Sequence, residues 1–134
     1  MKKIEHIGIA VANADKAIST FNALFNAKPY KMEKVPSEGV NTYFYQIGES
    51  KIELLEATNT ESPIAKFIAK RKEGIHHLAF HVEDIHLEMK RLVNEGFNVL
   101  VDVKKGADNK LICFLHPKST NGVLIELCQE ANVE

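Results

Sequence analysis

The sequence has 134 residues, of which 45% are hydrophobic, and it carries 17 basic and 18 acidic side chains. This length and apolar content suit one compact domain, and the balanced charge excludes a general attraction to nucleic acid. No apolar run approaches the roughly 20 residues of a membrane-spanning helix. The N-terminal stretch MKKIEHIGIAV contains no signal-peptide block, so we expect a cytoplasmic protein that acts on a small molecule without binding membranes.

The first half of the chain predicts a strand, a helix and three further strands. Residues 4–11 alternate between apolar and polar or small side chains, as in a strand, and Asn13 then offers an N-cap. Strands are predicted at 28–35, 40–47 and 51–57, because the turn-forming stretches PSEG and GES separate them. The helix after Asn13 carries apolar side chains at helical spacing, namely Ala14, Ala17, Ile18, Phe21, Leu24 and Phe25.

A short helix is predicted next, in the linker between residues 59 and 73. Ser62 is its N-cap, and Pro63 lies in the first turn, where a missing backbone N–H costs nothing.

The second half repeats the pattern of the first. Strand 75–82 leads through Asp84 into a helix that ends near Gly96, followed by strands near 97–103, 111–116 and 122–128. The apolar face of this helix consists of Ile85, Met89, Leu92 and Val93. The two cysteines, Cys113 and Cys128, lie in apolar stretches without metal-type or redox spacing, so we expect buried reduced thiols.

The two halves form an internal repeat of the type βαβββ. A shift of 71 residues aligns His6 with His77, and a shift of 73 aligns IELL at 52–55 with IELC at 125–128. Neither half can cover both faces of its own sheet. The predicted fold is therefore α+β: one domain over 1–134, with modules 1–58 and 74–130 joined by the linker 59–73, forming a curved mixed sheet around a cleft.

Strand alternation decides which histidine of the pair His76–His77 faces the open side of its sheet. His76 shares its face with the bulky Leu78, Phe80 and Val82, which should pack beneath a helix. His77 shares the other face with smaller side chains such as Ala79, as His6 does with Gly8 and Ala10. His6 and His77 are therefore both predicted to look into an open space.

Two glutamates repeat in the same way and complete a set of four polar residues. Glu53 and Glu126 each lie between two large apolar residues and point away from them. Buried carboxylates beside imidazoles require either mutual ion pairing or a cation. As a metal site, the set of His6, Glu53, His77 and Glu126 suits an octahedral divalent ion with two open positions, with Co²⁺ favoured over Ni²⁺, Mn²⁺ or Zn²⁺. A single strand histidine is most often a satisfied core or edge residue, and a single strand glutamate usually faces water. The coincidence of residue type and register in both halves is what favours a metal site.

Several longer stretches resemble methylmalonyl-CoA epimerases of the vicinal oxygen chelate superfamily. The widely shared blocks are HIGIAV and GVLIEL, whereas SPIAKF joined to GIHHLAF, with HPKS later, resembles the epimerases more specifically. The resemblance extends from Ile4 to Gln129 and implies paired βαβββ modules, a metal in the cleft, a homodimer, and interconversion of the 2R and 2S epimers of methylmalonyl-CoA in propionate metabolism. Carried over by position, the family's metal ligands fall on His6, Glu53, His77 and Glu126.

The resemblance also suggests roles in proton transfer. Glu126 is expected to be one acid/base in the formation of a metal-stabilised enolate, and Glu53 the other, because Thr42 stands where some epimerases have a second glutamate. Glu38, or a water molecule, is the alternative second base. Lys118 and His116, in the HPKS block, are expected to bind the substrate, with Lys104, Lys105 and Lys110 as further candidates for phosphate contacts.

Two other functions are also consistent with the sequence. Glyoxalase I uses a similar ligand set, but it typically has an arginine in the first strand and an ELTYN-like run where this chain has ELLEA. A non-catalytic small-molecule-binding member of the superfamily is the other alternative, although such proteins often lose metal ligands.

Overall fold

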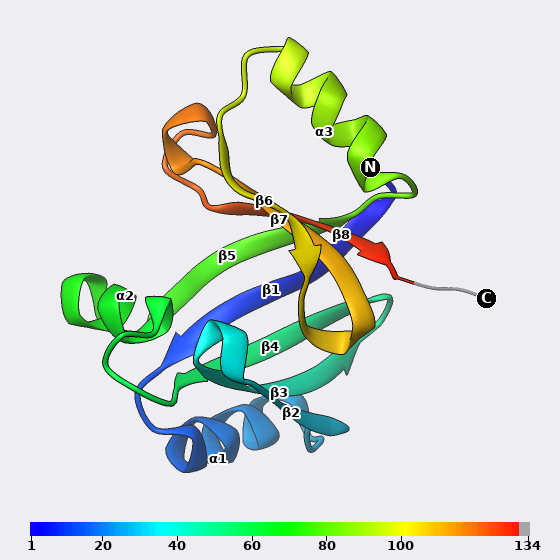
Figure 1. Ribbon diagram of the computed structural model, residues 1–134. Coiled ribbons are helices and arrows are strands. Elements are labelled where there is room, and N and C mark those ends of the chain that lie inside the picture. The colour runs from blue at the N-terminus through cyan, green and yellow to red at the C-terminus, as the bar shows by residue number, and fades with distance from the viewer. Residues whose placement is uncertain (132–134) are drawn as a thin grey trace. The chain divides into compact units, whose positions relative to one another are not determined.

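The computed structural model describes residues 1–131 and confirms the α+β class, with the order βαβββ occurring once before and once after the helix α2 in the sequence (Figure 1). The elements of the first half are β1 (Lys3–Val11), α1 (Ala14–Phe25), β2 (Lys31–Val35), the 3-10 turn η1 (Pro36–Glu38), β3 (Val40–Ile47) and β4 (Ser50–Ala57). After α2 (Pro63–Arg71) come β5 (Gly74–His81), α3 (Ile85–Asn94), β6 (Val99–Lys105), η2 (Ala107–Asn109), β7 (Lys110–Leu115), η3 (Pro117–Ser119) and β8 (Ile125–Glu130). No helix within residues 1–131 has the length and apolar character that a membrane span requires.

The chain forms two compact units, and the boundary falls inside β1 and β5. The N-terminal unit is Ile7–His76, and the C-terminal unit is Met1–His6 together with the chain from His77 onward. In the N-terminal unit the strand order is β2-β3-β4-β1-β5, and in the C-terminal unit it is β1-β5-β8-β7-β6. The division of the sequence into modules 1–58 and 74–130 stays a prediction.

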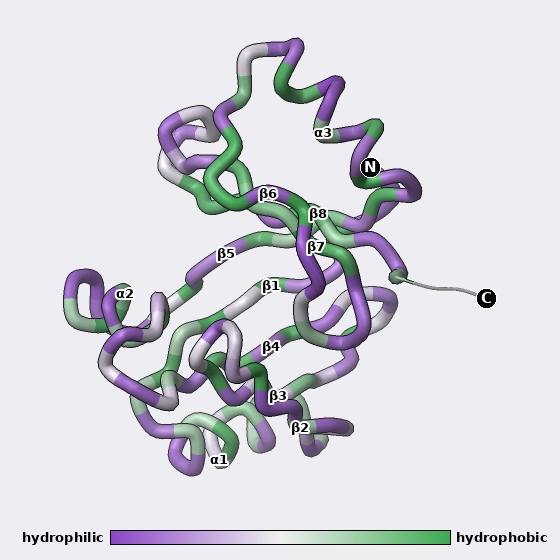
Figure 2. Tube along the Cα trace, in the orientation of Figure 1, coloured by the Kyte–Doolittle hydropathy of each residue, from purple (hydrophilic) through white to green (hydrophobic). Residues whose placement is uncertain are grey.

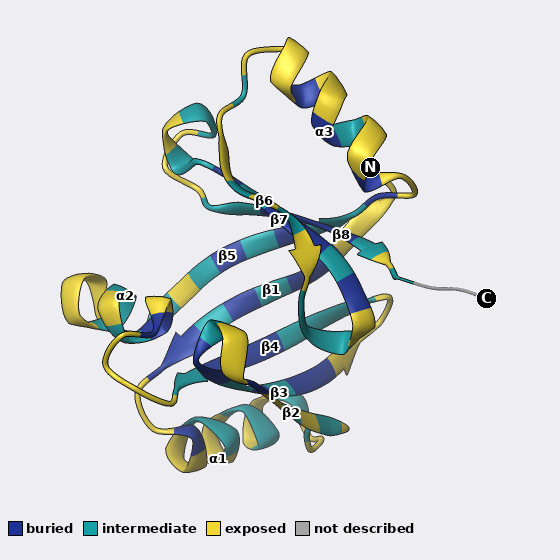
Figure 3. Cartoon of the chain, in the orientation of Figure 1, coloured by how far each residue is buried: buried dark blue, intermediate teal, exposed yellow. Residues whose placement is uncertain are grey.

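In the C-terminal unit, strand register separates an apolar face from a mixed face. β5 and β8 are parallel, with Phe80 opposite Leu127, and β7 is antiparallel to β8, with Cys113 opposite Leu127. These side chains lie on one face of the strands and pack against the buried side of α3. Figure 3 shows the buried and exposed residues of α3. The buried members of this cluster are Val82, Ile85, Met89, Leu92, Cys113, Leu115 and Leu127.

The N-terminal unit has a core of its own beneath α1. Val11, Tyr45 and Leu54 are buried there and pack against the apolar side of the helix, including Ile18 and Phe21. Hydrophobic and hydrophilic residues are mixed along α1, as the hydropathy colouring shows (Figure 2). Each unit therefore buries one face of its strands beneath a helix.

The two predicted helix N-caps, Asn13 and Ser62, are confirmed, and Asp84 caps α3 in the same way. The side chains of Asn13, Ser62 and Asp84 each accept a hydrogen bond from a backbone N–H in the first turn of the helix that follows. Such bonds satisfy donors that a helix start otherwise leaves without partners. Pro63 is the first residue of α2, as predicted.

Two strands begin three residues later than predicted. β2 begins at Lys31 rather than at residue 28, after Pro29, whose ring nitrogen has no hydrogen to donate to a ladder. β8 begins at Ile125 rather than at residue 122, because Gly122 has φ 88° and donates its N–H to the carbonyl of Pro117, which keeps it in the preceding turn.

The prediction of buried reduced cysteines is confirmed, since Cys113 and Cys128 are both buried and neither forms a disulfide bond. Burial, assisted by the negative charge of Glu126, raises the pKa of the Cys113 thiol to about 12. At pH 8 the thiolate is then roughly one part in ten thousand, and only the thiolate attacks alkylating reagents.

We therefore expect iodoacetamide at pH 8 to leave Cys113 unmodified in the folded protein and to alkylate it fully in urea. Mass spectrometry of the peptide that contains Cys113 measures both reactions, and the urea sample is the control. Equal labelling rates in the two samples would contradict the predicted burial.

Candidate metal centre

The mixed face of the C-terminal unit brings together three of the predicted site residues. Ala79 on β5 lies directly opposite Glu126 on β8, so the two side chains share a face, and His77 joins them two residues before Ala79. Ala79 is fully buried and has only a methyl group, which leaves space beside it. His6 reaches the same place from β1, as the alternation argument predicted.

The polar atoms of His6, His77 and Glu126 meet at short distances. His6 Nε2 lies 2.9 Å from His77 Nε2, and Glu126 Oε1 lies 2.9 Å from His77 Nε2 and 3.3 Å from His6 Nε2. All three residues are at most 6% exposed. We call these three residues the ligand triad.

The electrostatics of the ligand triad centre on Glu126. Burial by itself would raise the pKa of this carboxyl, but the charges of His6 and His77 and their hydrogen bonds outweigh burial and hold the pKa well below its ordinary value. Glu126 is therefore an anion, and its charge is balanced by a proton shared with the imidazoles or by a cation that they bind.

The ligand triad fits a divalent metal ion by donor chemistry and by geometry. Two imidazole nitrogens and one carboxylate oxygen that face one another have too few hydrogens between them for each to accept a hydrogen bond, whereas one cation can be bound by all three atoms. Bonds of about 2.1 Å at right angles would place neighbouring donor atoms about 3.0 Å apart, and tetrahedral angles about 3.4 Å apart. Two of the three distances match the right-angle value, and the third lies between the two.

Two further side chains orient the ligand triad. Glu5 Oε1 accepts a hydrogen bond from His6 Nδ1 at 2.5 Å, and Cys128 Sγ donates to Glu126 Oε2 at 3.3 Å. The sequence analysis missed Glu5, because neighbours in a strand ordinarily point to opposite faces. Its only signal was a charged residue next to a predicted ligand.

Glu53 and Thr42 belong to the N-terminal unit. Glu53 is buried on β4, directly opposite Phe44 of β3. Thr42 is also buried and lies on the same face, opposite Leu55 of β4. The metal-ligand and acid/base roles of Glu53 stay predictions.

The other histidine of the pair has a packing role. His76 stacks edge-to-face on Phe67 of α2, with ring centroids 4.9 Å apart. His77 is thus the residue whose ring belongs to the ligand triad, consistent with the alternation of side chains along β5.

The predicted substrate-binding residues lie around the η3 turn. His116 Nδ1 accepts a hydrogen bond from the backbone N–H of Lys118, and the Lys118 side chain is exposed. Lys110 differs from these, because it is 4% exposed and its Nζ lies 2.9 Å from Glu130 Oε2. Lys110 is therefore an internal ion-pair partner rather than a surface lysine.

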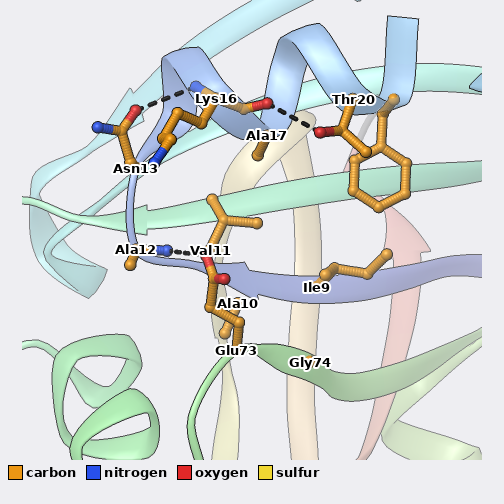
Figure 4. A pocket seen from close by; sticks show the side chains of 11 residues that line it. Ile9, Ala10, Val11, Ala12, Asn13, Lys16, Ala17, Thr20, Glu73 and Gly74 are labelled. Atoms are coloured by element: carbon orange, nitrogen blue, oxygen red, sulfur yellow. Dashed lines mark hydrogen bonds between the residues drawn. The ribbon is translucent and has the colours of Figure 1, made fainter. Parts of the chain in front are cut away.

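A separate pocket of about 470 Å³ lies in the N-terminal unit, between β1 and α1 (Figure 4). Its wall contains Ile9, Ala17 and Phe21, and Glu73 accepts a hydrogen bond there from the backbone N–H of Ala12 at 2.6 Å. The pocket has no convergent set of imidazoles and carboxylates in its lining, so its chemistry differs from that of the ligand triad.

Comparisons with known proteins identify a matching family and similar proteins. A family model described as the glyoxalase/bleomycin resistance protein/dioxygenase superfamily matches residues 5–114. The ethylmalonyl-CoA/methylmalonyl-CoA epimerase of Cereibacter sphaeroides is 38% identical over 95% of this chain and 97% of its own.

Two solved structures show how closely the backbone is shared. A hypothetical protein from Bacillus halodurans has a TM-score of 0.94 at 42% identity, covering 98% of this chain and 96% of that one. A methylmalonyl-CoA epimerase in complex with methylmalonyl-CoA and NH₄⁺ has a TM-score of 0.92 at 33% identity, covering 98% and 96%.

The histidine pair offers a matched test of the ligand triad. We expect His77→Ala to weaken Co²⁺ binding to the metal-free protein by at least about 100-fold, because it removes a donor atom. His76→Ala should change the affinity less than about twofold, because this ring packs on Phe67. Titrations followed by the visible absorption of bound Co²⁺ measure both, and equal losses in the two variants would contradict the assignment.

Proposed function

Because the chain belongs to the glyoxalase/bleomycin resistance protein/dioxygenase superfamily, we propose that it is a metal-dependent epimerase that interconverts (2R)- and (2S)-methylmalonyl-CoA. The observation that carries this proposal is the convergence of His6, His77 and Glu126 in a buried position that suits a divalent ion. The similarity to named epimerases over nearly the whole chain supports the choice of substrate.

His6, His77 and Glu126 would hold the ion, and Glu53 would be a fourth ligand. The case for Glu53 is its repeat relation to Glu126 and its burial. When bound, a divalent ion supplies Lewis-acid stabilisation of the negative charge that develops next to the thioester carbonyl. Two imidazoles and two carboxylates suit octahedral transition metals, of which we favour Co²⁺, with Ni²⁺, Mn²⁺ or Zn²⁺ as alternatives.

Inversion at C2 requires proton transfer on both faces of the planar carbon, so two acid/base groups are needed. We assign one role to Glu126 and the other to Glu53. Thr42 has a hydroxyl group that does not titrate near neutral pH and is not a candidate. The low pKa of Glu126 makes it a weak base while its imidazole contacts persist, so proton abstraction requires that these contacts loosen.

Substrate binding would involve the η3 turn. Lys118 is exposed and would contact the CoA phosphates, and His116 would support it by holding the η3 turn. We also propose a homodimer and a cytoplasmic location, both of which rest on the sequence and the family resemblance.

Metal removal with two alternative substrates tests the activity. We expect C2 deuterium incorporation from D₂O into methylmalonyl-CoA to cease after EDTA treatment and to return with Co²⁺, while the methylglyoxal–glutathione adduct stays unchanged throughout. Mass spectrometry of the CoA ester and absorbance of the glutathione thioester measure the two reactions. Turnover of the glutathione adduct alone would identify a glyoxalase I, and inactivity on both would favour a binding protein.

Glu53→Gln tests the second base, since the amide keeps a ligand oxygen but accepts no proton. We expect exchange that starts from one epimer to slow by about 100-fold or more, with the metal content unchanged. Glu49→Gln, in the exposed turn between β3 and β4, is the control. Wild-type exchange rates from both epimers in Glu53→Gln would exclude Glu53 as a base.

A further inference from the structure

Two buried charged residues of the C-terminal unit lie beside the ligand triad without belonging to it. Glu5 and Lys110 are each 4% exposed, and side chains of these types are rarely so buried unless they are paired. The inference drawn from them rests on the proposed function, because it concerns the residue that would hold the metal.

Glu5 fixes the imidazole of His6 in one form. Its carboxylate accepts the hydrogen on Nδ1 at 2.5 Å, so a neutral His6 ring carries its hydrogen on Nδ1 and presents a lone pair at Nε2. Nε2 is the atom that lies 2.9 Å from His77 Nε2 and 3.3 Å from Glu126 Oε1. The opposite tautomer would place a hydrogen between these atoms and block a metal.

Lys110 in turn holds Glu5. Its Nζ lies 3.9 Å from Glu5 Oε2, while Asp108 and Glu130 approach the same Nζ at 3.5 Å and 2.9 Å. Lys110 pairs with Glu130 across β7 and β8, and β8 also carries Glu126. The positive charge of Lys110 therefore compensates the buried Glu5 carboxylate, which would otherwise be strongly unfavourable in a dry interior.

We propose that Glu5, anchored by Lys110, is a positioning residue that orients His6 for metal binding. Metal-binding histidines commonly donate their second ring N–H to a carboxylate, and loss of that carboxylate typically weakens metal affinity 10- to 100-fold. Here the carboxylate is the residue immediately before the histidine, and a lysine from β7 keeps it in place.

Glu5, His6 and Cys128 also form a second group whose potential ligand atoms lie within 4.8 Å of one another. Hydrogen bonds account for this group without a second ion, because His6 Nδ1 donates to Glu5 and Cys128 Sγ donates to Glu126. The positioning role therefore predicts one bound metal per chain and no thiolate ligand.

The test uses Glu5→Ala, Glu5→Gln and Lys110→Met in the full chain. We expect Glu5→Ala to weaken Co²⁺ binding about 10- to 100-fold at an unchanged ratio of one ion per chain. Glu5→Gln should lose less, since an amide oxygen still accepts a hydrogen bond, and Lys110→Met should lose up to about 10-fold. The controls are Glu88→Gln, which removes an ion pair with Arg91 on α3, and Lys90→Met, at an exposed position of α3.

A second measurement separates this inference from the proposed function. Long-range ¹H–¹⁵N NMR of the metal-free protein reports the His6 tautomer, and we expect the Nδ1–H form in the wild type and its loss in Glu5→Ala. This result holds whichever substrate the protein uses. Wild-type tautomer and Co²⁺ affinity within about twofold in Glu5→Ala would overturn the inference, as would a thiolate-to-Co²⁺ absorption band that Glu5→Ala abolishes. If Glu5→Ala does not fold, Glu5→Gln gives the same readouts.

Discussion

The arrangement of the C-terminal unit depends on a carboxylate that is kept charged in a buried position. Glu126 is 5% exposed, and a lone carboxylate so far from water would take up a proton. The two imidazoles of His6 and His77 reverse that tendency, and the pKa of Glu126 is lowered despite burial. A group of this kind is stable only with positive charge beside it, and a divalent cation supplies that charge directly.

Strand register provides the close approach that this group requires. The parallel pairing of β5 with β8 sets Ala79 opposite Glu126, and the antiparallel pairing of β7 with β8 sets Phe114 opposite the same residue. The Phe114 ring then packs edge-to-face against His77, with centroids 5.8 Å apart. A small residue on one side and an aromatic ring on the other thus leave space for the imidazole and restrict its orientation.

The same register gives the two faces of these strands different tasks. Leu127 lies between Glu126 and Cys128 in sequence but points into the apolar cluster beneath α3. Glu126 and Cys128, on either side of Leu127, point to the mixed face, where the Cys128 thiol donates a hydrogen bond to Glu126. Stability and chemistry therefore come from alternating positions of one strand, so that a shift of register by one residue would exchange them.

The amino-acid sequence by itself determined the order of elements, the helix N-caps Asn13 and Ser62, and the histidine of the pair that lies on the mixed face. These features follow from local rules, because hydrophobic period, capping side chains and strand alternation act over a few residues. Only the tertiary structure decided the roles of Glu5 and Lys110, since alternation alone assigns Glu5 to the face opposite His6, and Lys110 reads as a surface lysine. Their contact joins β1 to β7, about a hundred residues away along the chain. Charges so far apart in sequence are paired only by the order of the strands in the sheet, and no local sequence pattern encodes that order.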